Sequence, residues 1–350
     1  TITHLADRIQ SDIRRRDLSE GDRYLNASEA AKRFRVSTNS ANRALQLLAK
    51  RRVVTRKQRA GTFIHRGLSG DTALNTIGRV HLLVHERYLK EEGVLTDGVL
   101  LGIQSALPGA TIEFNFIPPD NEKEFIGQLI HGADQSDVAH AFVLVRASLL
   151  CQRMIADAGY PAVIHGTPYP CIHPINSLDR DWDQAAVLAV DYLTKAKCRQ
   201  FLILSREVSS PGLHRSIDAI SKQLELSGVK QTSVVLRSLY ADAELVAAEI
   251  DEVLTLAPGK KLGVIGLSEP LCEAALSRLR SLDSTKPGYS VVSAIHYKRT
   301  GRSEPDYPYL MPVSSAEQMG EDIGRILLEA RPHGQRSTSR RYPMRLVCPD

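Results

Sequence analysis

The sequence has no long hydrophobic run and no paired cysteines. No apolar stretch among its 350 residues approaches the roughly 18 that a membrane span needs. The first residues, TITHLADRIQSDIRRRD, are charged almost at once, so no signal peptide is visible. The five cysteines are scattered and none forms a CxxC pair, which argues against structural zinc and a disulfide framework. We therefore expect a cytoplasmic protein with no membrane partner.

The common catalytic motifs are also missing. The sequence contains no GxGxxG after a strand, no GxxxxGK[ST], no GxSxG and no HExxH. GLSEP, residues 266–270, lacks the closing glycine of a nucleophile elbow. We predict no catalytic residue, no metal site and no cofactor, and we interpret the chain as a binding protein rather than an enzyme.

Charge is distributed unevenly along the chain. Residues 1–67 contain 16 Lys plus Arg against 6 Asp plus Glu, whereas the remainder contains 29 against 34. A basic head on a mildly acidic body favours a polyanionic partner for the head, although a solvated charged surface would give the same balance.

The head has the pattern of a winged helix. Leu5, Ile9 and Ile13 form one stripe of a helix over residues 3–16. Asn26 and Glu29 form a capping-box pattern at the start of a second helix, ASEAAKRF. Ser37 is a good N-cap for a third helix. Residues 53–56 and 62–65 then read as two strands around a turn that contains glycine.

The third helix carries residue types that read bases. Its predicted buried stripe is Ala41, Ala44, Leu45 and Leu48. Asn39, Asn42, Arg43 and Gln46 have the same helical spacing on another face. Amide side chains can bond adenine and arginine can bond guanine in the major groove, so this face suits DNA, although a solvated polar face has the same spacing.

Residues 4–64 resemble the winged-helix head of GntR-type bacterial repressors. The resemblance rests on GDRYLNASEAAKRFRVSTNSANRAL and on the closing AGTFI. At three positions where the family commonly has an arginine that contacts DNA, this sequence has Ser28, Thr38 and Asn42. Arg59 stands where the family has the first glycine of the wing. The candidate DNA-binding residues are Ser28, Ser37, Thr38, Asn39, Ser40, Asn42, Arg43, Gln46, Arg59 and Gly61.

The body alternates strand and helix patterns. Predicted strands cover residues 79–85, 111–117, 140–146, 162–166, 200–205, 233–239, 262–267 and 289–295, with helical patterns between them. Such alternation indicates a doubly wound α/β architecture with parallel sheets. We predict a winged helix-turn-helix over 1–67, a linker over 68–77 and a two-lobed effector-binding and dimerisation domain over 78–350, with ligand contacts at the strand carboxyl ends.

The body also resembles the effector domain of LacI-type repressors, which has a periplasmic-binding-protein fold. DWDQAAVLAVDYL is similar to a family segment that places Asp181 in the effector pocket. SSPGLHRSIDAI and VIGLSEPLCEAAL similarly place Arg215 and Glu269 there. SVVSAIHY puts Ile295 and His296 where acidic residues are usual. The resemblance implies that the effector is a carbohydrate or a derivative of one.

Further candidates come from their positions in the sequence. Arg87 comes shortly after the predicted strand 79–85 and Arg146 ends the predicted strand 140–146, and each is either a ligand contact or a surface charge. Trp182 either stacks on a ligand ring or is an ordinary buried aromatic. A GntR-type head on a LacI-type body resembles regulators of pentose use. We predict a dimeric repressor that binds double-stranded operator DNA under the control of a small polar effector. The alternative is a solute-binding protein for transport, which would need a signal peptide and no basic head.

Overall fold

The computed structural model describes residues 2–16, 18–19, 21–51, 53–57, 61–65, 77–85, 97–136, 138–172, 175–207, 209–282, 288–295, 304–330 and 337–349. The chain forms two compact units, one of residues Thr1–Leu178 with Ala316–Arg340 and one of Asp179–Ser315 with Arg341–Asp350. We call them unit 1 and unit 2. Residues 68–76 of the predicted linker lie outside the described residues, and the predicted domain boundaries remain predictions.

Unit 1 begins with the head, residues 1–67. Its elements are α1 (Ile2–Arg15), β1 (Arg23–Tyr24), α2 (Ala27–Phe34), α3 (Thr38–Lys50), β2 (Val54–Lys57) and β3 (Gly61–Ile64). The strands form an antiparallel sheet in the order β1-β3-β2. The predicted winged helix is confirmed, although β1 was not predicted and each wing strand lies one residue nearer the turn than expected.

Local signals in the sequence set the helix boundaries of the head. The Asn26 side chain accepts from the Glu29 N–H at 2.9 Å and Glu29 accepts from the Asn26 N–H at 2.7 Å, so the capping box forms. The Ser37 hydroxyl accepts from the Ser40 N–H at 3.0 Å and caps α3. The apolar stripes of the three helices pack into one cluster with Tyr24 and Val54.

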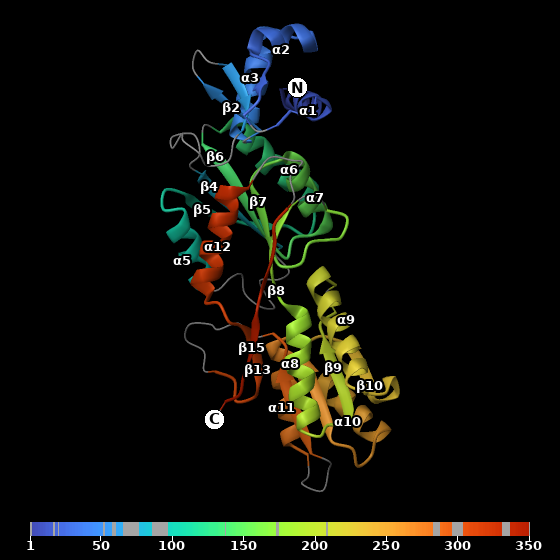
Figure 1. The fold of residues 1–350 in the computed structure, drawn as a ribbon. Helices are drawn as coiled ribbons and strands as arrows, with labels where there is room; N and C mark the ends of the chain where they lie inside the picture. The colour runs from blue at the N-terminus through green and yellow to red at the C-terminus, as the bar shows by residue number, and fades with distance from the viewer. Residues whose placement is uncertain are drawn as a thin grey trace. The chain divides into compact units, whose positions relative to one another are not determined.

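The α/β part of unit 1, residues 77–178 and 316–340, is the first lobe. Its elements are β4 (Ile77–His85), α5 (Asp97–Ala106), β5 (Thr111–Ile117), α6 (Glu122–Gln135), β6 (Ala139–Val145), α7 (Leu149–Ala158), β7 (Ala162–His165), β8 (Asn176–Arg180), α12 (Ala316–Glu329) and β14 (Ser339–Tyr342), of which β8 and β14 extend past the boundary with unit 2. The sheet order is β14-β8-β7-β6-β4-β5, and its five strands from β8 to β5 are parallel. Helices α5 and α12 lie on one side of the sheet and α6 and α7 on the other (Figure 1).

Unit 2 is a second doubly wound sheet. Its elements are α8 (Trp182–Lys195), β9 (Gln200–Ser205), α9 (Pro211–Leu226), the 3₁₀ turn η2 (Gln231–Ser233), β10 (Val234–Ser238), α10 (Ala243–Leu256), β11 (Leu262–Gly266), α11 (Glu269–Arg280), β12 (Tyr289–Ser293), β13 (Tyr309–Pro312) and β15 (Met344–Val347). The order is β10-β9-β11-β12-β13-β15, parallel as far as β13, with β15 antiparallel at the edge.

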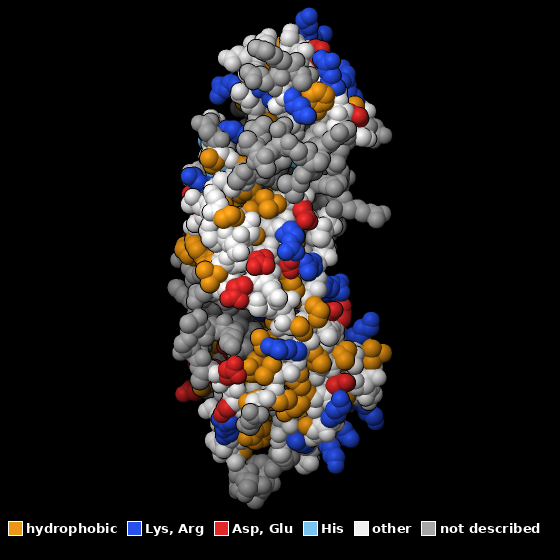
Figure 2. Space-filling view, turned by 60° about the vertical axis from the view of Figure 1, so that its left-hand side comes forward, with side chains coloured by type: hydrophobic (Ala, Val, Ile, Leu, Met, Phe, Trp, Pro, Cys, Tyr) orange, Lys and Arg blue, Asp and Glu red, His pale blue; other side chains and the backbone are white. Residues whose placement is uncertain are grey.

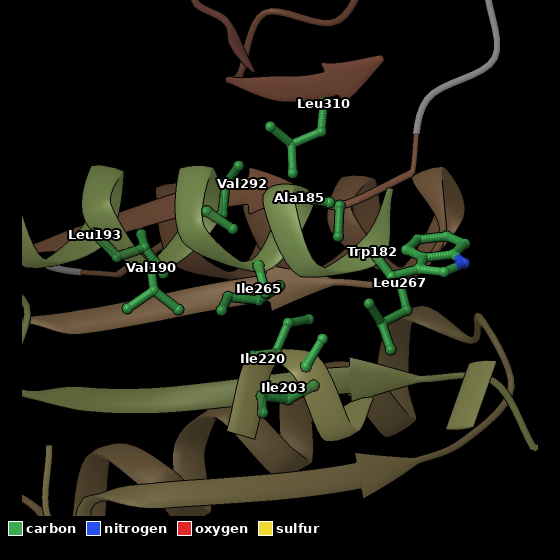
Figure 3. Packing of buried hydrophobic residues seen from close by; sticks show 14 of the residues in the cluster. Trp182, Ala185, Val190, Leu193, Ile203, Ile220, Ile265, Leu267, Val292 and Leu310 are labelled. Atoms are coloured by element: carbon green, nitrogen blue, oxygen red, sulfur yellow. The ribbon is translucent and has the colours of Figure 1, made fainter. Parts of the chain in front are cut away.

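Alternation along the strands of unit 2 divides its core into two layers. Phe201 and Ile203 pack with α8 and α9, whereas Leu202 and Leu204 pack with α10 and α11. Successive side chains of a strand point to opposite faces, so a strand buried on both faces is apolar throughout. Figure 3 shows the first layer, where Ile203, Ile265 and Val292 lie near Val190 and Ile220.

Two neighbouring strands of the first lobe, β4 and β6, carry a pair of buried histidines, His81 and His140. His81 Nε2 lies 2.8 Å from His140 Nδ1, and the rings stack at 5.0 Å. His81 Nδ1 lies 3.2 Å from the Asn115 amide and 3.4 Å from Glu113. Burial, with the positive charge of Arg79, lowers the pKa of His81 to about 4. Burial, His81 and Arg79 lower the pKa of His140 to about 4.

These depressed pKa values predict acid lability. The unfolded chain binds protons on His81 and His140 near pH 6.5, whereas the folded chain does not bind them until about pH 4. The stability that these histidines contribute is therefore fully present above pH 6.5 and is lost as the pH falls towards 4. The loss is roughly 3 kcal/mol for one histidine. In urea unfolding across this range, His140→Gln should flatten the dependence and exposed His131→Gln should not. Equal pH profiles for wild type and His140→Gln would contradict the prediction.

Candidate DNA-binding surface and effector site

Helix α3 separates its buried and exposed faces as predicted. Ala41, Ala44, Leu45 and Leu48 are all fully buried. Thr38, Asn39, Arg43 and Gln46 are exposed, while Asn42 and Ser40 are half-buried and Ser37 is exposed at the cap. The structure therefore exposes Asn39, Arg43 and Gln46 of the predicted base-reading residues and leaves Asn42 half-buried. Their contacts with DNA remain a prediction.

The wing lies beside this helix in the sequence and pairs with β1. Lys57 is opposite Gly61 in the register of β2 and β3. Gly61 has a φ of 118°, which a side chain would strain, so glycine suits this position. Arg59 lies outside the described residues. The exposed Arg23 of β1 lies against Gly61 and adds a cation that the sequence reasoning did not select. Ser28 is exposed in the first turn of α2.

A buried carboxylate holds the helices of the head together. Asp12 of α1 accepts from Arg33 Nε at 3.0 Å and Nη2 at 2.5 Å, and from the Tyr24 hydroxyl at 3.0 Å. Burial acts to raise the pKa of Asp12, but the bonds from Arg33 and Tyr24 outweigh it and lower the pKa. Arg33 counted towards the basic charge of the head, yet its guanidinium links α2 to α1.

Basic side chains lie at the carboxyl ends of three adjacent strands of the first lobe. His85 ends β4, Arg146 follows β6 and His165 ends β7. The strands are parallel neighbours, so these three positions share the carboxyl edge of one sheet. Arg146 has a left-handed φ of 51°. Arg146 was predicted at this edge, His85 and His165 were not selected, and Arg87 lies outside the described residues.

The start of α8 uses two predicted effector residues structurally. Asp181 is the N-cap of α8 and accepts from the Gln184 N–H at 3.0 Å. Trp182 is only 6% exposed and packs in the core of unit 2 (Figure 3). It donates its indole N–H to Asp179 at 3.1 Å. These contacts agree with the reading of Trp182 as a buried aromatic, and a contact with an effector remains a prediction for both residues.

The other candidates of unit 2 lie near the carboxyl ends of its strands. Arg215, in the first turns of α9, donates to Asp183 at 3.1 Å, and Arg341 donates to the same oxygen at 3.1 Å. Glu269 begins α11 directly after β11, and Ile295 follows β12; both are buried. β11 and β12 are neighbours, so these two positions share one edge. His296 lies outside the described residues.

Among the residues that the structure describes, no group of three or more His, Cys, Asp or Glu is arranged to hold a metal ion. None of the described helices is long and apolar enough to span a bilayer.

The comparison with protein families decides the nature of the head. Residues 1–64 match the model of the bacterial regulatory proteins of the gntR family. The head is therefore a gntR-type DNA-binding domain of a transcriptional regulator. No curated protein matches the chain.

Solved structures share the fold of most of the chain. A complex of the transcriptional regulator CelR with cellobiose is 18% identical, has a TM-score of 0.58, and the match covers 89% of each chain. A LacI family regulator from Enterococcus faecium with bound ribose is 14% identical, with a TM-score of 0.56, over 77% of this chain and 96% of that one. The lac repressor dimer bound to operator and anti-inducer is 14% identical, with a TM-score of 0.59, over 77% and 92%. The body thus has the fold of LacI-type regulators, as predicted.

Proposed function

We propose that the protein is a dimeric, effector-controlled repressor that reads operator DNA with α3 and contacts the DNA backbone with its wing. The observation that carries this proposal is the exposed face of α3 in a gntR-type head. Thr38, Asn39, Arg43 and Gln46 face solvent together, and all four can donate hydrogen bonds to base edges or phosphates. The fold of the body is also compatible with a solute-binding protein, but such a protein has no use for this head.

We propose a small polar effector that carries a carboxylate or phosphate group. Arg146, His85 and His165 supply guanidinium and imidazole donors at one sheet edge, and Arg215 lies near the corresponding edge of unit 2. A guanidinium binds a carboxylate or phosphate with two parallel hydrogen bonds. The buried Ile295 stands where the family has an acidic residue, which favours an anion over a neutral sugar. CelR binds cellobiose, so a neutral sugar is the natural rival.

Exposed apolar side chains on edge strands support the homodimer. Phe114 and Phe116 of edge strand β5 are 41% and 42% exposed, and Leu101 of α5 is 61% exposed. The face with α5 and β5 comes forward in Figure 2, where hydrophobic side chains gather between charged ones. In unit 2, Leu236 of edge strand β10 and Leu245 of α10 are also exposed. Apolar edge strands invite pairing or coverage, which a second copy would supply.

One experiment tests DNA reading, symmetry and effector class together. The full chain is used to select duplexes from random and genomic DNA, alone and with sugars, sugar acids or sugar phosphates. We expect enriched duplexes with two inverted half-sites about one helical turn apart, because paired heads of a dimer read two half-sites. We also expect sugar acids or sugar phosphates to change the yield more than neutral sugars. If no duplex is enriched under any condition, the proposed repressor function is wrong.

A further inference from the structure

A buried arginine joins the head to the first lobe. Arg51 directly follows α3, and although it is charged its side chain is only 2% exposed. It donates to Asp134 at 3.2 and 3.3 Å and to Asp7 of α1 at 3.2 Å. Asp134 lies in the last turn of α6, in the first lobe, 83 residues away in sequence. The arginine therefore holds one carboxylate of the head and one of the body.

Tyr160 completes this contact from a third segment. Its hydroxyl donates to Asp134 at 2.6 Å, and its ring lies 5.6 Å from the Arg51 guanidinium carbon. Burial and the hydrogen bond to Asp134 both raise the pKa of Tyr160. We call Arg51, Asp134 and Tyr160 the docking cluster. Lys50, the last residue of α3, also donates its ammonium to the Ser136 carbonyl of the same lobe.

Burial of these charges argues for a role in orientation. Moving an ion pair out of water costs several kcal/mol, so a buried pair is weak evidence for stability alone. Its strict geometry instead selects one arrangement of the two bodies that it joins. The anchored residues are at the carboxyl end of α3, while Thr38, Asn39 and Arg43 near the amino end remain exposed. The contact with the first lobe therefore leaves these side chains of α3 exposed to solvent.

The contacts on the lobe lie at the amino ends of two central strands. Ser136 lies shortly before β6, and Tyr160 lies two residues before β7. The carboxyl ends of the same strands carry Arg146 and His165, which we assign to the effector edge. A shift of β6 or β7 on effector binding would therefore move the residues to which α3 is anchored.

We propose that Arg51, Asp134 and Tyr160 are positioning residues that hold α3 in one orientation on the first lobe, so that the lobe carries the reading helix to the operator. The inference rests on the proposed repressor function and adds how the head is directed. Asp134 and Tyr160 lie outside the head, and the guanidinium of Arg51 is bound to carboxylates. The cluster therefore acts on DNA affinity through orientation rather than through contact with phosphates.

The test compares the full-length wild type with Asp134→Asn and Tyr160→Phe. If docking falls to about a tenth, affinity for the selected operator falls about tenfold, because only the oriented head binds well. The slope of log affinity against log salt should stay the same, since no phosphate contact is removed. Hydrogen exchange without DNA should be faster in the last turns of α3 and α6 and unchanged in α10. Asp134→Glu should restore part of the affinity.

Asp157→Asn is the matched control, because Asp157 is an exposed carboxylate of α7 that pairs only loosely with Arg153 at 3.9 Å. It removes the same charge from the same lobe and should change neither affinity nor exchange. Tyr160→Phe removes a single hydroxyl and guards against a folding defect in Asp134→Asn. Wild-type exchange rates in both variants would overturn the docking inference whatever the DNA results. A wild type that selects no operator would instead overturn the repressor function.

Discussion

Gly102→Ala should unfold the first lobe, at a cost of at least about 4 kcal/mol, which is the range of the most damaging single substitutions. Gly102 of α5 lies where that helix crosses α12, and a Cβ there would lie 2.0 Å from the Glu317 carbonyl oxygen. A Cβ on Gly320 would lie 2.1 Å from the Val99 carbonyl oxygen of the facing helix. Both obstacles are backbone atoms, so no side-chain rotation can make room.

The crossing is tight along its whole length. Gly98 faces Ala316, and Gly324 faces Ala106, each at less than 3 Å from an added Cβ. Small residues four apart on both helices let the two backbones touch. An added methyl would have to separate the helices, which would open the core of the lobe on that face of the sheet.

Gly132→Ala is the matched control for this prediction. Gly132 lies in α6 of the same lobe, is exposed and has no atom within 4 Å of an added Cβ. Replacing a helical glycine by alanine there should stabilise the chain by about 0.5–1 kcal/mol. Urea unfolding followed by circular dichroism measures both variants. A Gly102→Ala protein with wild-type stability would show that α5 and α12 do not pack this closely.

The alternation of strands and helices could be predicted because its signals are local. The predicted strands 111–117 and 200–205 have the same bounds as β5 and β9, since apolar runs between turns mark them. The strands β8, β13, β14 and β15 were missed, as was α12. β14 has the sequence SRRY, and three of its four residues are exposed, so it lacks the apolar pattern of a buried strand.

The features of the candidate site could likewise be predicted only where their sequence signals are local. The polar face of α3 follows from helical periodicity within 13 residues, and the structure exposes Asn39, Arg43 and Gln46 on it and leaves Asn42 half-buried. The pairs Asp12–Arg33, His81–His140 and Arg51–Asp134 join residues 21 to 83 positions apart. Each partner alone looks like an ordinary polar residue, so only the tertiary fold shows that these side chains meet.

Operator affinity should fall about a thousandfold between 50 and 200 mM salt, because about six phosphate contacts in the dimer release their counterions. Each head presents Arg23, Arg43 and Lys57 as exposed cations around α3 and the wing. Three contacts for each head give that number. Lys57→Ala should weaken binding to all duplexes alike and reduce the slope of log affinity against log salt by about 2 in the dimer.

Asn42→Ala should give the opposite pattern, since its amide suits adenine N6 and N7. We expect the salt slope to stay the same, while discrimination at one A·T pair falls by about 1–3 kcal/mol. Lys260→Ala removes a charge from an exposed site of unit 2 and should leave both quantities unchanged. Titrations of operator, mutated operator and random duplex at several salt concentrations separate the two effects. An Asn42→Ala protein that loses affinity equally for all duplexes would place Asn42 on the phosphate backbone, because a residue that contacts only phosphates cannot distinguish base pairs.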